Sequence, residues 1–303
     1  MTLRSLNAIG FACRSRQDLA TTLATMSAKQ TETTITESGI VRHWRGVSGA
    51  EIVFRYAVPP RDRRADDAVN ALTDLVGLSA FHQGQGAITA TCLASVAVGS
   101  SDPMAGVWHV GLAPDHHTGQ APELLVEMVP FKPIVVLPDT PKQHTLQIVG
   151  FCTRLETFKS LADYLQNMPR KLLCPPGSIL ATAAGPTLRR RVGTLGQSAA
   201  MITGVVKQVR RLTNPVTGNG YHWLLVATDR GEIDLLAASI GEENGPSVGS
   251  LICAHADLVA RPTERQVMPC TMPAFVPKTP TDQAVQALNG ILQCLPRRRV
   301  SAA

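Results

Sequence analysis

The chain has 303 residues, of which 44% are hydrophobic and 17% are charged. This length accommodates two domains with a substantial core, and the apolar fraction excludes global disorder. The net charge of +6 is local: residues 170–211 contain 8 basic and no acidic residues, whereas 1–169 contain 14 and 15, and 212–303 contain 7 and 8. The chain is therefore nearly neutral apart from one basic segment.

Signals for membranes, export and disulfides are weak. The longest uncharged stretch, 75–101, contains His, Gln, Gly, Ser and Thr, which is not typical of a bilayer span, and the apolar run 9–13 is too short for a signal-peptide core. We expect a soluble cytoplasmic protein without a membrane partner. The 7 cysteines include no CxxC pair, which favours reduced and mostly buried thiols over a zinc site.

The first 60 residues predict the order strand, helix and three strands. The apolar run 7–13 is typical of a strand, and Ser15 is a candidate N-cap of a helix whose apolar residues recur at three- or four-residue spacing up to Met26. Alternating patterns then predict strands at 33–36, 40–44 and 51–58.

The segment 47–54, with the sequence VSGAEIVF, combines a turn and a strand at the end of this unit. On these residues, the unit within 5–58 resembles one module of the vicinal-oxygen-chelate, or glyoxalase-like, superfamily, whose repeat is βαβββ. In that superfamily the turn precedes a metal-binding carboxylate. Alignment of Gly49 with the family glycine places Val53 at the carboxylate position. The resemblance thus implies a glyoxalase-like fold that has lost metal binding at this strand.

Residues 86–158 are rich in predicted strands, which we expect at 88–98, 107–112, 123–129 and 145–153. Leu161 and Leu165 predict a short helix over 160–168, which ends before Pro169. We therefore expect a first, mixed α+β domain at 1–168, followed by a connector at 169–188.

The region after the connector predicts a small barrel. Strands are expected at 202–209, 221–228, 232–235 and 251–259, separated by a Gly/Asn loop, a turn and a polar loop. In the last of them, alternation places Ile252, Ala254, Ala256 and Leu258 on one face. This succession resembles an OB-fold, which we expect at 189–265.

The C-terminal segment 266–303 has a different composition. Four prolines between 269 and 280 favour an extended linker, and the apolar side of 281–295 predicts a final helix that packs on a domain or a partner. No internal repeat of solenoid length is visible. The predicted fold class is β-rich α+β: a mixed-sheet N-terminal domain, a small OB-like β-barrel and a C-terminal helix.

Two motifs suggest catalysis only weakly. Residues 245–249 match the GxSxG pattern, but a nucleophile elbow needs a strand before Ser247 and a helix after it, whereas here a polar loop precedes and a strand follows. Asp115-His116-His117 is similar to the motif of the DHH phosphoesterases, but no DxD pair accompanies it, which favours a solvated loop over a metal site. We therefore predict no catalytic residue, no metal ligand and no cofactor, and leave open whether the chain is an enzyme.

The basic segment is the strongest remaining feature. An OB-fold that binds single strands needs basic groups along a groove and aromatic platforms for stacking. Alternatively, the basic side chains pair with acids of the first domain. The candidate binding residues are Arg189, Arg190, Arg191, Lys207, Arg210, Arg211, Tyr221 and Trp223.

The leading hypothesis is a non-enzymatic binding or adaptor protein, which contacts a partner protein or a second copy of itself through the barrel and the basic segment. The first alternative is a single-stranded nucleic-acid-binding protein that uses the same surface. The second is a degenerate or unusual metal-dependent enzyme in the N-terminal domain.

Overall fold

A computed structural model describes most of the chain and is β-rich, as predicted. The described residues are 3–13, 15, 18, 21–22, 26, 32–36, 38–57, 75–97, 102, 104–114, 121–131, 142–168, 174–182, 198–238, 245–265 and 267. The predicted linker and helix in 266–303 lie outside them, apart from residue 267.

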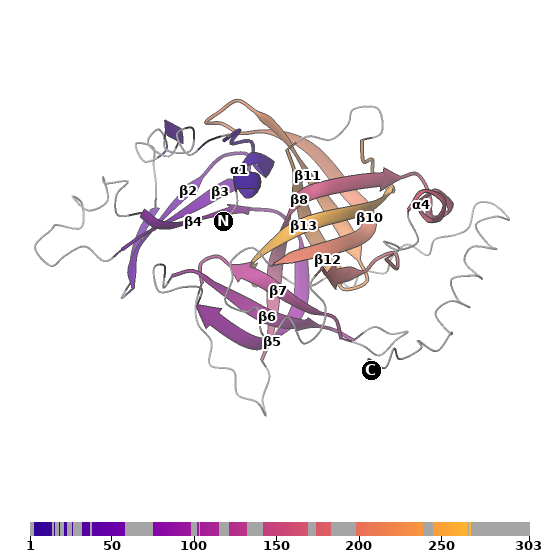
Figure 1. The fold of residues 1–303 in the computed structure, drawn as a ribbon, viewed down its shortest axis with the longest axis horizontal. Helices are drawn as coiled ribbons and strands as arrows, with labels where there is room; N and C mark the ends of the chain where they lie inside the picture. Colours follow the sequence, from indigo (N-terminus) through magenta and orange to yellow (C-terminus); the bar gives the residue numbers. More distant parts are fainter. Residues whose placement is uncertain are drawn as a thin grey trace, which may run out of the picture.

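The N-terminal part of the chain forms a four-stranded antiparallel sheet in the order β1-β2-β3-β4 (Figure 1). The helix and strands of this part are α1 (Leu3–Ala8), β1 (Glu32–Thr36), β2 (Gly39–Arg45), β3 (Ala50–Tyr56) and β4 (Leu75–His82). The strands predicted at 33–36, 40–44 and 51–58 are confirmed within two residues, whereas β4 was not expected.

The predicted first strand at 7–13 is wrong, because the chain starts with helix α1. The amide of Phe11 donates to the carbonyl of Leu6 (3.0 Å), and that of Gly10 donates to the carbonyl of Asn7 (3.0 Å). These two bonds and the positive φ of Gly10 (85°) form a Schellman motif, which ends the helix. Leu6 and Phe11 are both buried. The glycine was therefore the signal for a helix end within this apolar run.

The predicted N-cap at Ser15 is confirmed. Its hydroxyl accepts a hydrogen bond from the amide of Asp18 (3.1 Å), and the Asp18 carboxylate accepts one from the amide of Ser15 (3.1 Å). This reciprocal pair is a capping box. Met26, which is helical and fully buried, is the last described residue of the stretch, and Leu19 and Leu23 lie outside the described residues.

The rest of the described chain forms one mixed nine-stranded sheet. Its strands are β5 (Ala87–Ala97), β6 (Gly106–Leu112), β7 (Glu123–Met128), β8 (Gln143–Phe158), β9 (Ile179–Ala181), β10 (Ala199–Thr213), β11 (Gly220–Thr228), β12 (Gly231–Ala237) and β13 (Leu251–Pro262). Each strand predicted in this region is present, although β8 and β10 are longer than expected. The short helix predicted over 160–168 is α4 (Leu161–Asn167), and its N-cap is Ser160.

Eight of these strands form two quartets with the same connectivity. In the first, β5, β6 and β7 form an antiparallel meander, and β8 returns to pair with β5. In the second, β10, β11 and β12 form the meander, and β13 returns to pair with β10. Each quartet is thus a Greek key. The chain contains an internal structural repeat, although no repeat of solenoid length was visible in its sequence.

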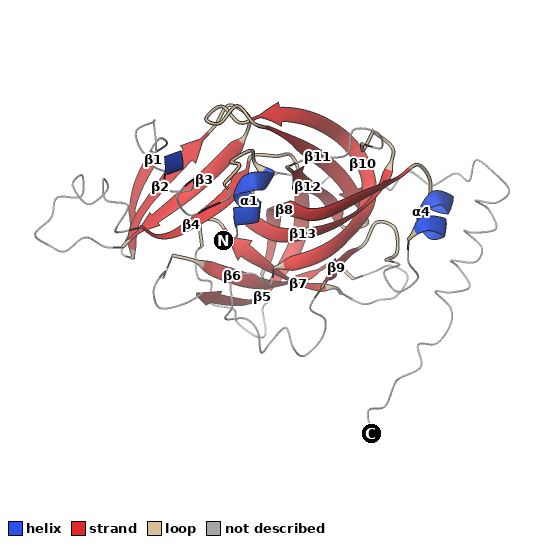
Figure 2. Cartoon of the chain, turned by 45° about the horizontal axis from the view of Figure 1, so that its top comes forward, coloured by secondary structure: helices blue, strands red, loops and turns tan. Residues whose placement is uncertain are grey.

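Each quartet is closed into a ring by the last strand of the other. β8 runs parallel to β12, β13 runs parallel to β7, and β8 and β13 pair with each other in antiparallel orientation. The first ring therefore consists of β5, β6, β7, β13 and β8, and the second of β10, β11, β12, β8 and β13. Figure 2 shows β8 and β13 side by side between the two sets of strands. Both rings share this central strand pair.

This pairing crosses the predicted domain boundary. β8 lies within 1–168, yet it pairs with β12 and β13, which both lie within 189–265. The predicted connector contains β9, which pairs with β10. The two predicted regions are thus continuous in one sheet.

One continuous core fills the inner side of both rings. Inward-facing residues of both quartets belong to it, among them Trp108, Leu146, Leu224 and Leu258. The predicted shared face of Ile252, Ala254, Ala256 and Leu258 is confirmed, because all four belong to this core.

A second core lies between the four-stranded sheet, α1 and the outer side of the rings. It includes Phe54 and Phe81 from the sheet, and Trp223 and Leu236 from the second ring. The four-stranded sheet therefore covers the outer face of β11 and β12.

No helix among the described residues is both long and apolar enough to cross a bilayer.

Gly150 lies in β8 where the two rings meet, and a Cβ atom there would come within 2.7 Å of Leu235 Cδ2 and 3.0 Å of the Ala256 Cβ. We expect Gly150→Ala to lower the free energy of unfolding by about 1–3 kcal/mol through overpacking. In Gly111→Ala, the new Cβ would be 3.4 Å from Leu93, an ordinary contact, so we expect a change within about 0.5 kcal/mol. Urea denaturation measures both, and equal effects would contradict the close packing at Gly150.

Candidate binding surface on strand β10

Strand β10 carries all the candidate basic residues that the structure describes. It pairs with β11, and their register shifts between Val206 and Gln208, which leaves Lys207 as an extra, bulged residue. Beyond the bulge, Arg210 lies opposite Trp223 and Arg211 lies opposite His222. Residues 170–171 and 189–191 lie outside the described part of the chain.

Lys207, Arg210 and Arg211 are exposed, and we call the three together the basic surface of β10. Arg210 lies on the same face of the sheet as Trp223, and Arg211 lies on the opposite face. No ion pair joins any of the three to an acidic side chain of the described residues. In contrast, Arg55 pairs with Asp102 at 2.8 Å, and Arg261 pairs with Glu51 at 2.9 Å. For the basic surface, pairing with acids of the N-terminal region is thus not observed.

Two contacts hold the Arg210 side chain in place. Its guanidinium lies over the Trp223 ring, 5.4 Å from the centroid, in a cation–π contact. It also donates a hydrogen bond to Gln208 (3.4 Å), whose amide donates to the side chain of Gln85 (3.0 Å). Arg210 is therefore oriented before any partner binds.

The two predicted aromatic platforms are not on this surface. Tyr221 is 0% exposed and donates a hydrogen bond to the carbonyl of Ser48 (3.0 Å). Trp223 is 3% exposed and donates to Asp234 (2.9 Å). Both aromatic side chains pack beneath the four-stranded sheet, where no base can stack on them. The sheet that covers the outer face of β11 is formed by residues distant in sequence, so no local pattern indicates that Tyr221 and Trp223 are buried.

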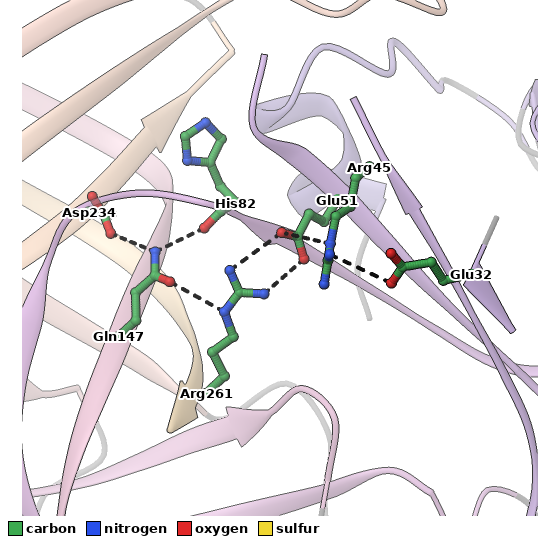
Figure 3. A network of polar contacts seen from close by, with 7 residues as sticks. All are labelled: Glu32, Arg45, Glu51, His82, Gln147, Asp234 and Arg261. Carbon is green, nitrogen blue, oxygen red and sulfur yellow. Dashed lines mark hydrogen bonds and ion pairs between the residues drawn. The ribbon is translucent and has the colours of Figure 1, made fainter. Parts of the chain in front are cut away.

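A buried polar network connects the second ring with the four-stranded sheet (Figure 3). At its centre is Asp234, which is fully buried and accepts four hydrogen bonds of 2.9–3.0 Å. The donors are the amides of Gln85 and Gly86, the side-chain amide of Gln147 and the indole of Trp223. Four donors satisfy the buried carboxylate without a direct cationic partner.

Gln147 connects this carboxylate to an ion pair. Its amide nitrogen donates to Asp234 and to the carbonyl of His82 (3.1 Å), while its oxygen accepts from Arg261 (3.3 Å). Arg261 in turn donates to both oxygens of Glu51, at 2.9 and 3.4 Å, and lies over the Phe81 ring. Figure 3 shows the sequence of contacts from Asp234 to Glu51. The network thus fastens β3 and β4 to β8, β12 and β13.

Two glycines allow the chain to approach Asp234 so closely. A Cβ atom at Gly84 would lie 2.1 Å from the Asp234 carboxyl carbon, and one at Gly86 would lie 3.0 Å from the Asp234 backbone nitrogen. This segment leads from β4 into β5. The alternation in 232–235 did not show that an acid there would be buried, and nothing local indicated the partners of Asp234.

His82 is buried beside this network. Its Nε2 is 3.2 Å from the carbonyl of Ser48, and its Nδ1 has no partner among the described residues. Burial lowers the pKa of His82 below its ordinary value, although the nearby Asp234 carboxylate opposes this shift. The ring is therefore held in its neutral form, with a proton on Nε2 that faces Ser48.

The other candidate chemistry is only partly described. The GxSxG segment forms a turn closed by Ser247 and Ser250, and the strand expected after it is β13. Asp115-His116-His117 lies outside the described residues, and within the described ones no three His, Cys, Asp or Glu side chains are grouped to hold a metal ion. Val53, at the position of the glyoxalase-like carboxylate, is buried.

The described cysteines are free, and burial raises the pKa of Cys152 and Cys253 to about 12.

Comparison of the chain with protein families, curated proteins and solved structures finds no match.

We expect Asp234→Asn to lower the free energy of unfolding by about 2–4 kcal/mol, because an amide group cannot accept all four hydrogen bonds that the carboxylate receives. Glu232→Gln is the matched control, since it removes the same charge from a half-buried position of β12. Chemical denaturation at pH 7 measures both variants. Equal losses would show that Asp234 has no special structural role.

We expect stability to decrease as the pH falls below about 6.5, the ordinary pKa of histidine in the unfolded chain. Burial lowers the pKa values of His43, His82, His144 and His222 in the folded protein, so the unfolded state takes up protons first. Above that pH these groups are neutral in both states and contribute no pH dependence. Denaturation at pH 5 and pH 7 should show a smaller difference in His82→Gln than in the wild type, and an unchanged difference would exclude His82 as a contributor.

Proposed function

We propose that the protein is a non-enzymatic binding or adaptor protein, and that the basic surface of β10 contacts an acidic partner protein. The observation that carries this proposal is that Lys207, Arg210 and Arg211 are exposed and have no acidic partner among the described residues. The exposed cationic side chains of this strand create a positive electrostatic potential, which is complementary to an acidic protein surface.

The burial of Tyr221 and Trp223 supports a contact made by charge rather than by stacking. Proteins that bind single strands without sequence preference usually combine a basic groove with aromatic platforms. In this protein the two candidate aromatic side chains, Tyr221 and Trp223, are buried. An acidic protein segment needs no such platform, because cationic side chains suffice to contact its carboxylates.

A single-stranded nucleic acid is the second candidate partner, and the strand topology favours it. Each ring is a five-stranded Greek key, which resembles an OB-fold, and OB-folds bind oligonucleotides on their second and third strands. In the second ring those strands are β11 and β12, whose outer face is covered. A nucleic acid would therefore contact β10 through its phosphates.

Fluorescence anisotropy with a labelled polyglutamate peptide and a labelled oligothymidylate separates these candidates. We expect the peptide to bind at low salt, and its affinity to fall as salt is added. Lys207→Glu with Arg211→Glu should weaken binding at least about tenfold, because two attractive charges become repulsive.

The matched control is Arg154→Glu with Lys159→Glu. It makes the same change in charge at exposed residues of β8 and of the turn before α4, where we expect less than about a twofold effect. Binding of the oligonucleotide alone would instead favour the second candidate. Absence of binding by both probes at low salt would contradict the proposed function.

A further inference from the structure

The two rings present strands β5 and β10 in equivalent places. Each is the first strand of its quartet and pairs in antiparallel orientation with the last strand of the same quartet. Each also contains one irregularity in its pairing with the second strand, between Cys92 and Ala94 in β5 and between Val206 and Gln208 in β10. The internal repeat therefore extends to the position of a β-bulge.

The bulges align the two strands residue by residue. Leu93 and Lys207 are the bulged residues, after which Ser95 pairs with Trp108 and Val209 pairs with Leu224. Trp108 and Leu224 both belong to the core inside the rings. In this alignment, Trp108 of the first ring corresponds to Leu224 of the second, and both face inward.

The exposed side chains at the aligned positions are chemically different. Lys207 corresponds to Leu93, Arg210 to Val96 and Arg211 to Ala97 by this register. Leu93 is 38% exposed and Ala97 is exposed, while Val96 is half-buried. The same backbone arrangement therefore carries three cations in the second ring and no charged residue at the equivalent positions of the first.

We infer that the two rings, which share one strand order, are unequal in function: one acidic partner binds per chain, along β10, and the equivalent strand β5 takes no part. This inference rests on the proposed function and identifies which of two equivalent surfaces performs it. The two strands share their place in the quartet and the position of the bulge, so the side chains at these three positions decide where the partner binds. Replacement of the cationic side chains would make β10 resemble β5 and would remove the electrostatic attraction for carboxylates.

Two variants with the same change in net charge test the inference with the polyglutamate peptide. Lys207→Leu with Arg211→Ala gives β10 the residues of β5, and Leu93→Glu with Ala97→Glu places two acids at the equivalent exposed positions of β5. We expect the first to weaken binding at least about fivefold, and the second to change it by less than about twofold. Isothermal titration of the wild type should give one peptide per chain.

A stoichiometry of two, or an equal loss of affinity in both variants, would overturn the inference and leave the proposed function intact. A wild type that binds no peptide at low salt would overturn both. Circular dichroism and thermal unfolding of the variants confirm that a loss of binding is not a loss of fold. All four substituted residues are exposed, so we expect both variants to fold as the wild type does.

Discussion

The structure depends on the antiparallel pairing of β8 with β13. These two long strands are the only ones that belong to both rings within the described part of the chain, and each pairs in parallel with the third strand of the other quartet. Because each ring needs a strand from the other half of the chain, neither can close alone. The consequence is that a single core fills the inside of both rings.

The polar network is a second constraint, which fixes the four-stranded sheet on the rings. Burial of the Asp234 and Glu51 carboxylates in a largely apolar interface would be costly without partners; Glu51 pairs with the half-buried Arg261, and the side chain of Gln147 joins Arg261 to Asp234. The same carboxylate receives the indole hydrogen of Trp223, over which Arg210 lies. The interior thus supports one of the three side chains of the basic surface. Rigid support of this kind reduces the entropy that a binding side chain loses.

Local patterns predicted most strands but not how the strands pair. The alternation in 251–259 and the cap at Ser15 are properties of neighbouring residues, and both predictions are confirmed. In contrast, β8 and β12 are far apart in sequence, and the sequence of neither strand indicates that it pairs with the other. The same limit applies to the site: the exposure of Arg210 agrees with its charge, whereas the burial of Trp223 depends on a sheet formed by distant residues.

A closed ring has no edge strand. In most sheets, the outermost backbone groups can pair with a strand from another chain, and this is a common way to recruit an extended peptide. β8 and β13 occupy the positions where such pairing would occur in each quartet. The backbone at these closing positions is therefore already committed to internal hydrogen bonds, so another molecule is recognised there through side chains. Where the rings close, the chemistry of those side chains, rather than an open strand, determines what can bind.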